Sequence, residues 1–219
     1  MMDAILDTIF AERVVVLARG VPVSAMPKVV AALKAGGVKV MEVTFAPADP
    51  DTLSKTAEAI RIANDLGLLC GAGTVLEPAM VDAAAEAGAR FIISPDTYDV
   101  VIRHTKARGL LSIPGAYTPS EVLAAHRLGA DIVKVFPVLP DEADYIKVLC
   151  GPLPHIPLMA TGGVTAQTAA SFLRAGARVV AAGACVINAG LVAAGAWDDM
   201  ARLASELVAA VKDKERHHG

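Results

Sequence analysis

The sequence predicts an α/β protein, a (β/α)8 TIM barrel with one extra helix at the N-terminus. The first observation is a repeated pattern in which a helix ends at a glycine and a short apolar strand follows, as in Leu66-Gly67-Leu68. Glycine readily adopts the left-handed conformation that ends many helices. The second observation is the spacing of these glycines, which recur at positions 67, 88, 109 and 129. Steps of about 20 residues suit compact βα units, and strands that alternate with helices predict a parallel sheet.

Eight short apolar segments are the predicted strands, and their content of Val, Ile and Leu is typical of strands buried on both faces. In chain order they are Val14–Ala18, Val38–Thr44, Leu68–Gly71, Phe91–Ser94, Leu110–Ile113, Ile132–Phe136, Leu158–Thr161 and Val179–Ala182. An open doubly wound sheet is the alternative arrangement. No Gly-x-Gly-x-x-Gly follows the first strand, which disfavours that alternative.

Helical segments separate the predicted strands. They include Asp3–Ala11 before the first strand, Pro27–Ala35, Ala79–Ala87, Ser120–Leu128, Ala166–Ala175 and the closing helix Asp198–Lys212. Thr118 and Thr165 are predicted helix N-caps, and Glu121 completes a capping box with Thr118. We expect one domain over residues 1–219, with a frayed tail at 212–219.

Composition narrows the class of protein. Hydrophobic residues make up 54% of the 219 residues, and aromatic residues only 4%, so the core must consist of Ala, Val, Leu and Ile. The net charge of -3 makes a nucleic-acid partner improbable. Three scattered cysteines suit a reducing, cytoplasmic location. The chain has neither a signal-peptide pattern at its start nor an uncharged apolar run of about 18 residues, so we expect no membrane association.

Lys134 is the most informative residue, because it interrupts an apolar, mostly β-branched run from Ile132 to Pro137. Lysine is almost never fully buried unless it is paired or used. Burial favours the neutral amine, which is a nucleophile that can form a Schiff base with a carbonyl compound. The alternative is a lysine at a strand end that extends its amine to solvent.

Other polar or small residues also fall at the carboxyl ends of the predicted strands, where TIM barrels carry their active sites. In strand order they are Arg19, Glu42 with Thr44, Gly71 to Thr74, Ser94-Pro95, Pro114-Gly115, Lys134 with Phe136, Thr161 to Gly163, and Gly183. Each has a purely structural alternative. Glu42 can belong to a buried ion pair, Arg19 can cap a helix or bridge subunits, and the glycines can serve turns. Their convergence on one mouth favours catalysis.

These groups suit chemistry on a 2-keto acid. Attack by Lys134 on the keto carbon would give a protonated imine, which is an electron sink, so the carbon–carbon bond one carbon beyond it can break and leave an enamine. Glu42 is the carboxylate embedded in a strand end, so it is the candidate general acid/base. Arg19 offers a bidentate fork for the substrate carboxylate, and Thr74 offers a hydroxyl.

An anion site is also predicted where Gly162 and Gly163 lead into the helix capped by Thr165. Free backbone N–H groups at a helix N-terminus bind anions. The loops after the last strands hold phosphate in many TIM barrels.

The ordered motifs resemble the class I 2-keto-3-deoxy-6-phosphogluconate (KDPG) aldolases, a family that overlaps with the 4-hydroxy-2-oxoglutarate aldolases. The matching motifs are Glu42-Val43-Thr44, Gly71-Ala72-Gly73-Thr74-Val75, Ser94-Pro95, Pro114-Gly115, Lys134-x-Phe136-Pro137 and Thr161-Gly162-Gly163-Val164. They extend the resemblance from about Val14 to about Asn188.

The resemblance implies a carbon–carbon lyase that cleaves a 4-hydroxy-2-keto acid to pyruvate and an aldehyde. It further implies a homotrimer, no cofactor and no metal. Lys134 matches the Schiff-base lysine, Glu42 the catalytic glutamate, Phe136 a residue packed against the imine and Thr161 a substrate contact near it. The residues expected to bind substrate are Arg19, Thr44, Thr74, Pro95, Phe136, Thr161, Gly162, Gly163, Gly183 and Ala184.

The chain departs from the family pattern at three places. Ala46 stands where some members have an arginine, although Arg19 matches the position that other members use. Ala184 replaces a serine that often contributes to phosphate binding. The loop after Pro137 contains Asp141, Glu142 and Asp144 instead of a glycine pair or Gly-Pro. Lyase chemistry is therefore a firmer expectation than a phosphorylated substrate.

Two other classes of function remain open from the residues alone. One is a phosphate-binding TIM-barrel isomerase or synthase without imine chemistry, which would also use Gly162 and Gly163 but would not require Lys134 with Glu42. The other is a non-catalytic barrel that only binds a ligand.

Overall fold

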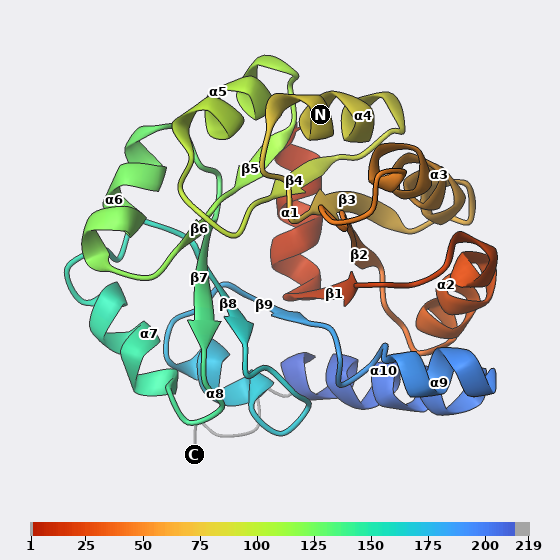
Figure 1. Cartoon of the computed structure of the whole chain (residues 1–219). Helices are drawn as coiled ribbons and strands as arrows, with labels where there is room; N and C mark the ends of the chain where they lie inside the picture. The colour runs from red at the N-terminus through yellow and green to blue at the C-terminus, as the bar shows by residue number, and fades with distance from the viewer. Residues whose placement is uncertain (1, 213–219) are drawn as a thin grey trace.

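The computed structural model describes residues 2–212 as a parallel barrel surrounded by helices (Figure 1). The strands of this described chain are β1 Val14–Ala18, β2 Val40–Thr44, β3 Leu69–Gly73, β4 Phe91–Ile93, β5 Leu111–Ile113, β6 Gly115–Ala116, β7 Val133–Val138, β8 Leu158–Gly162 and β9 Val179–Ala182. Their order around the sheet is β5-β4-β3-β2-β1-β9-β8-β7-β6. The predicted TIM barrel is confirmed.

β5 corresponds to the predicted strand Leu110–Ile113, and the short strand β6 lies beyond its predicted end and was not predicted. Pro114 separates them, and the two strands pair with different neighbours, β5 with β4 and β6 with β7. Together they therefore link the two ends of the sheet and bring the barrel close to full closure. The predicted strand boundaries differ from the structure by up to two residues elsewhere, and the strand Val14–Ala18 agrees at both ends.

Helices cover the outside of the barrel, and one helix lies across its amino-terminal end (Figure 1). Within residues 2–212 they are α1 Met2–Glu12, η1 Val23–Ala25, α2 Met26–Ala35, α3 Thr52–Asp65, α4 Pro78–Glu86, α5 Asp99–Ala107, α6 Pro119–Arg127, α7 Ala143–Cys150, α8 Ala169–Arg174, α9 Ala189–Ala194 and α10 Trp197–Lys212. None of these helices is both long and apolar enough to cross a bilayer. Lys212 ends α10, and the rest of the predicted tail lies outside the described residues.

The capping predictions have different outcomes. Thr118 and Glu121 form the predicted capping box of α6, because the side chain of each residue accepts the backbone N–H of the other. The predicted helix Ala166–Ala175 is wrong at its start, since regular helix begins at Ala169 with Thr168 as its N-cap. The hydroxyl oxygens of Thr165 and Thr168 each accept the backbone N–H of the other residue. These two bonds hold a turn between them before the helix begins.

Two apolar layers result from the alternation of side chains along each strand. One layer fills the barrel interior, where α1 closes the amino-terminal end. Its buried members are Ile9, Val15, Val40, Phe91, Ile93, Leu111, Ile113, Ile132, Met159, Val179 and Ala181. The second and larger layer lies between the strands and the outer helices. The interior is therefore a packed core that leaves only its carboxyl-terminal end for polar groups.

Candidate active site

Lys134 lies inside the barrel at the carboxyl-terminal end of the interior core. Strand alternation places its side chain on the same face of β7 as Ile132, which belongs to that core. The side chain is 6% exposed, so the alternative of an amine extended into solvent is wrong. Burial lowers the pKa of the Lys134 amine, and the Arg19 charge adds to this shift while the Glu42 carboxylate opposes it. A lowered pKa supplies the neutral amine that imine formation needs.

Glu42 lies inside the same mouth, at the third position of β2, and is 1% exposed. Its Oε2 atom is buried and has no hydrogen-bond partner in the described chain, and neither Glu42 nor Lys134 forms a direct ion pair there. Burial raises the pKa of the Glu42 carboxyl group, although the charges of Lys134 and Arg19 lower it. A buried carboxyl group that is not committed to a structural bond can accept or donate a proton.

Gly73 leaves the space that Glu42 occupies. A β-carbon at Gly73, on the neighbouring strand β3, would overlap the Oε1 atom and the carboxyl carbon of Glu42. The carboxylate therefore rests against bare backbone. Thr74, which follows, has a left-handed φ of 56° and accepts a hydrogen bond from Arg19 Nη2 at 3.2 Å. Arg19 itself is exposed, so its guanidinium is open to a ligand at the mouth.

Phe136 and Thr161 border Lys134 on β7 and β8. The Lys134 amine lies 4.7 Å from the centroid of the Phe136 ring, a geometry that stabilises a cation. A protonated imine at the same nitrogen would be stabilised in the same way. Thr161 is 3% exposed, and its hydroxyl is buried without a hydrogen-bond partner among residues 2–212. Such a hydroxyl is free to bond a ligand in the mouth.

Two other predicted residues have structural contacts. The Thr44 hydroxyl donates to the Ala18 carbonyl oxygen at 3.3 Å, which joins the ends of β2 and β1. A β-carbon at Gly115 would overlap the Pro95 carbonyl group, so the loop after β4 packs directly on β6. Gly115 in turn is paired in register with Lys134. Pro95 therefore supports the strand that lies beside the lysine.

The glycine pair at the end of β8 is not the open donor pair that the sequence suggested. Gly163 donates its N–H to the Val138 carbonyl oxygen at 2.6 Å. A β-carbon on Gly162 would overlap Val138, and one on Gly163 would overlap the backbone nitrogen of Pro140. The end of β7 thus packs directly on Gly162, and the loop that follows β7 packs directly on Gly163. Gly183 and Ala184 follow β9, where Ala184 is exposed and offers only a methyl group.

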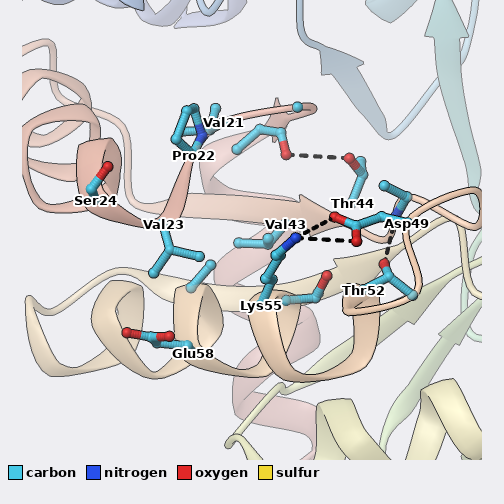
Figure 2. Close-up of a pocket in the computed structure, with 15 residues that line it drawn as sticks. Val21, Pro22, Val23, Ser24, Val43, Thr44, Asp49, Thr52, Lys55 and Glu58 are labelled. Atoms are coloured by element: carbon cyan, nitrogen blue, oxygen red, sulfur yellow. Dashed lines mark hydrogen bonds and ion pairs between the residues drawn. The ribbon is translucent and has the colours of Figure 1, made fainter.

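A cavity of about 560 Å³ lies beside the mouth, between the loops after β1 and β2 and the start of α3. Ala18 and Thr44 line it, whereas Lys134 and Glu42 do not. Figure 2 shows Lys55 paired with Asp49 among the residues that line it, with an N–O distance of 2.8 Å. The sequence analysis missed this pair, because a Lys and an Asp separated by five residues across a helix start carry no distinctive motif. The Lys55 amine is held by Asp49 and Asp51 and does not resemble a nucleophile.

A parallel barrel with a buried lysine and a buried, unpaired glutamate at its carboxyl-terminal mouth defines the site of a class I aldolase. Comparison with known proteins agrees. The family model described as "KDPG and KHG aldolase" matches residues 9–203. The chain belongs to this family, and it is an aldolase, a carbon–carbon lyase.

Three relatives illustrate the similarity. The 2-dehydro-3-deoxy-phosphogluconate aldolase of Pseudomonas aeruginosa is 31% identical over 191 residues, covering 85% of this chain and 83% of that protein. The KHG/KDPG aldolase of Escherichia coli is 32% identical over 188 residues, covering 83% and 84%. A solved structure described as "Native KDPGal structure" has a TM-score of 0.82 at 30% identity and covers 92% of this chain and 95% of that one. This membership decides against the isomerase, synthase and non-catalytic alternatives.

Proposed function

We propose that Lys134 is the Schiff-base nucleophile of an aldolase that cleaves a 4-hydroxy-2-keto acid to pyruvate and an aldehyde. The observation that carries this proposal is the buried amine of Lys134 among the interior side chains, with its pKa lowered by burial. The neutral amine attacks the C2 carbonyl carbon, and the resulting carbinolamine loses water to form a protonated imine.

Glu42 moves the protons in this proposal. It protonates the departing hydroxyl of the carbinolamine and then removes the proton from the C4 hydroxyl. The C3–C4 bonding electrons move into the imine, so an aldehyde leaves and an enamine of pyruvate remains on Lys134. Protonation of this enamine at C3 and hydrolysis of the imine release pyruvate. Burial raises the pKa of the Glu42 carboxyl group, which favours its protonated form and suits a proton donor.

The substrate carboxylate is proposed to bind at Arg19 and Thr74, which are already joined by a hydrogen bond. Arginine offers a planar pair of donors that matches a carboxylate. The Thr161 hydroxyl, which is buried and has no hydrogen-bond partner in the described chain, is the proposed substrate contact near the imine. The Phe136 ring is proposed to pack against the imine. Thr44, Pro95, Gly162, Gly163, Gly183 and Ala184 are proposed to complete the wall of the substrate site.

The names of the relatives suggest two substrates for testing. They are KDPG, which would give pyruvate and glyceraldehyde 3-phosphate, and 4-hydroxy-2-oxoglutarate, which would give pyruvate and glyoxylate. We further propose that residues 1–219 act as one catalytic domain in a cytoplasmic homotrimer. Sedimentation analysis of the purified chain tests the trimer.

Borohydride trapping tests the nucleophile. The protein is incubated with pyruvate, the imine is reduced, and the modified peptide is identified by mass spectrometry. We expect the added mass on the peptide that contains Lys134. Lys134→Arg keeps the positive charge and removes the nucleophile, so the trapped adduct should disappear. A variant that still traps pyruvate, or an adduct on Lys55, would show that the assignment is wrong.

A further inference from the structure

We propose that the aldehyde end of the substrate site accepts an uncharged group, and that Glu142 selects against a phosphate there. This inference rests on the proposed aldolase function and identifies the class of substrate more closely. It starts from the loop after β7, which the packing places directly on Gly163 at the end of β8.

Three of the backbone donors that could bind a phosphate at this end, those of Gly163, Thr165 and Thr168, are already used. Gly163 donates its N–H to Val138, the last residue of β7. The N–H groups of Thr165 and Thr168 donate to each other's hydroxyl oxygens, at 2.9 and 3.3 Å. The Thr168 hydroxyl donates in turn to the Gly163 carbonyl oxygen at 2.9 Å. A phosphate would have to break these bonds before it could take their donors.

Glu142 fixes a carboxylate beside the same glycines. Its Oε2 atom accepts the N–H of Leu139 at 2.8 Å, and its own N–H donates to the Leu139 carbonyl oxygen at 3.1 Å. A β-carbon on Gly163 would meet the carbonyl carbon of Leu139 at 2.6 Å, so Leu139 is in direct contact with the glycine pair. Leu139, which touches Gly163, therefore holds the negative charge of Glu142 near the glycine pair, and this charge would repel a phosphate bound there.

No cation offsets this charge on the neighbouring loops. The loops that follow β7, β8 and β9, at residues 139–142, 163–168 and 183–188, contain two carboxylates and no arginine or lysine. Their exposed side chains are partly apolar, because Leu139 is 55% exposed and Ala184 presents a methyl group. This surface suits a hydroxyl-bearing or apolar end group better than a dianion.

The test compares two substrates that differ only in the phosphate, 2-keto-3-deoxygluconate and its 6-phosphate. The kcat/KM of each is measured through pyruvate release, for the unaltered chain and for Glu142→Gln. Glutamine still accepts the Leu139 N–H and therefore keeps the turn, but it lacks the charge. We expect the unaltered chain to prefer the unphosphorylated substrate. In the variant, we expect the ratio of phosphorylated to unphosphorylated kcat/KM to rise about tenfold, the effect of one nearby unit charge.

Asp144→Asn is the matched control. It also removes one negative charge, but Asp144 lies in the first turn of α7 and is exposed to solvent. It should change the ratio by less than about threefold, since exposed charges are screened. A preference of the unaltered chain for the phosphorylated substrate, or an equal response of both variants, would overturn the inference. Pyruvate trapping on Lys134 without cleavage of either substrate would also overturn it. Loss of trapping itself would instead refute the proposed function.

Discussion

At the scale of single residues, the site combines two buried ionisable groups, and the pKa of each is shifted in the direction that favours its neutral form. Burial lowers the pKa of Lys134 and raises that of Glu42. Removing such groups from water costs free energy that a direct ion pair would partly recover. Within the described chain the two side chains do not form that pair, so the cost of their burial is not recovered, which agrees with the reactive roles proposed for them.

Glu42→Gln tests this view of the pair. Glutamine keeps the shape of the side chain but cannot take up a proton, so turnover should fall by about 10²–10⁴. The Glu42 charge raises the pKa of Lys134, and its loss should lower that pKa further. The pH midpoint of pyruvate trapping should therefore move down. Steady-state rates and trapping at several pH values give both results. A large loss of stability with turnover retained would instead indicate a structural role.

The sequence could predict which residues meet at the mouth, because strand alternation and the carboxyl-end rule need only the positions of the strands. Lys134, Glu42 and Thr161 lie where those rules place them. The rules cannot predict which loop donors remain free. The bond from Gly163 to Val138 and the turn closed by Glu142 depend on how one loop lies on another, and the sequence pattern carries no periodicity there.

At the scale of elements, the eight strands were predictable because each is a short apolar run bounded by a glycine or polar turn. The interruption of the fifth strand at Pro114 was not predicted as a break between β5 and β6, since it reflects barrel closure. The predicted start of α8 was wrong, because the side chains of Thr165 and Thr168 accept backbone N–H groups and hold a turn where regular helix was expected.

Gly36 controls how closely α10 approaches α2. A β-carbon at Gly36 would lie 2.5 Å from the Ala204 β-carbon and 2.6 Å from the Ala201 carbonyl oxygen, so α10 would have to move. The φ of Gly36 is -78°, which any residue tolerates, so the cost of Gly36→Ala is purely steric. We expect a loss of about 1–3 kcal/mol in the free energy of unfolding, measured by chemical denaturation.

Gly151→Ala is the control for this change. Gly151 has a helical φ of -54°, and a β-carbon there would meet the Val148 carbonyl oxygen at an ordinary 3.4 Å. The substitution should be neutral or stabilise by about 0.4–1 kcal/mol, because alanine restricts the unfolded chain. Equal effects at both positions would mean that the α2–α10 contact does not limit stability.

At the scale of the whole molecule, the barrel assigns stability and chemistry to opposite ends. α1 closes the amino-terminal end, where Ile9 packs against interior residues such as Val15 and Val40. Lys134 and Glu42 occupy the carboxyl-terminal end, above the same interior core. The packed layers between the two ends are continuous, so a change at one end could in principle spread to the other.

Ile9→Ala tests whether the two ends are independent. Ile9 is fully buried, and its truncation should cost about 2–5 kcal/mol in the free energy of unfolding through lost burial and a new cavity. We expect a lower Tm with kcat/KM unchanged at temperatures where the variant is folded, because no side chain at the mouth loses a contact. This is the reverse of the result expected for Glu42→Gln. If Ile9→Ala lowers kcat/KM in the fully folded protein, the core transmits the disturbance and the geometry of Lys134 depends on packing at the far end.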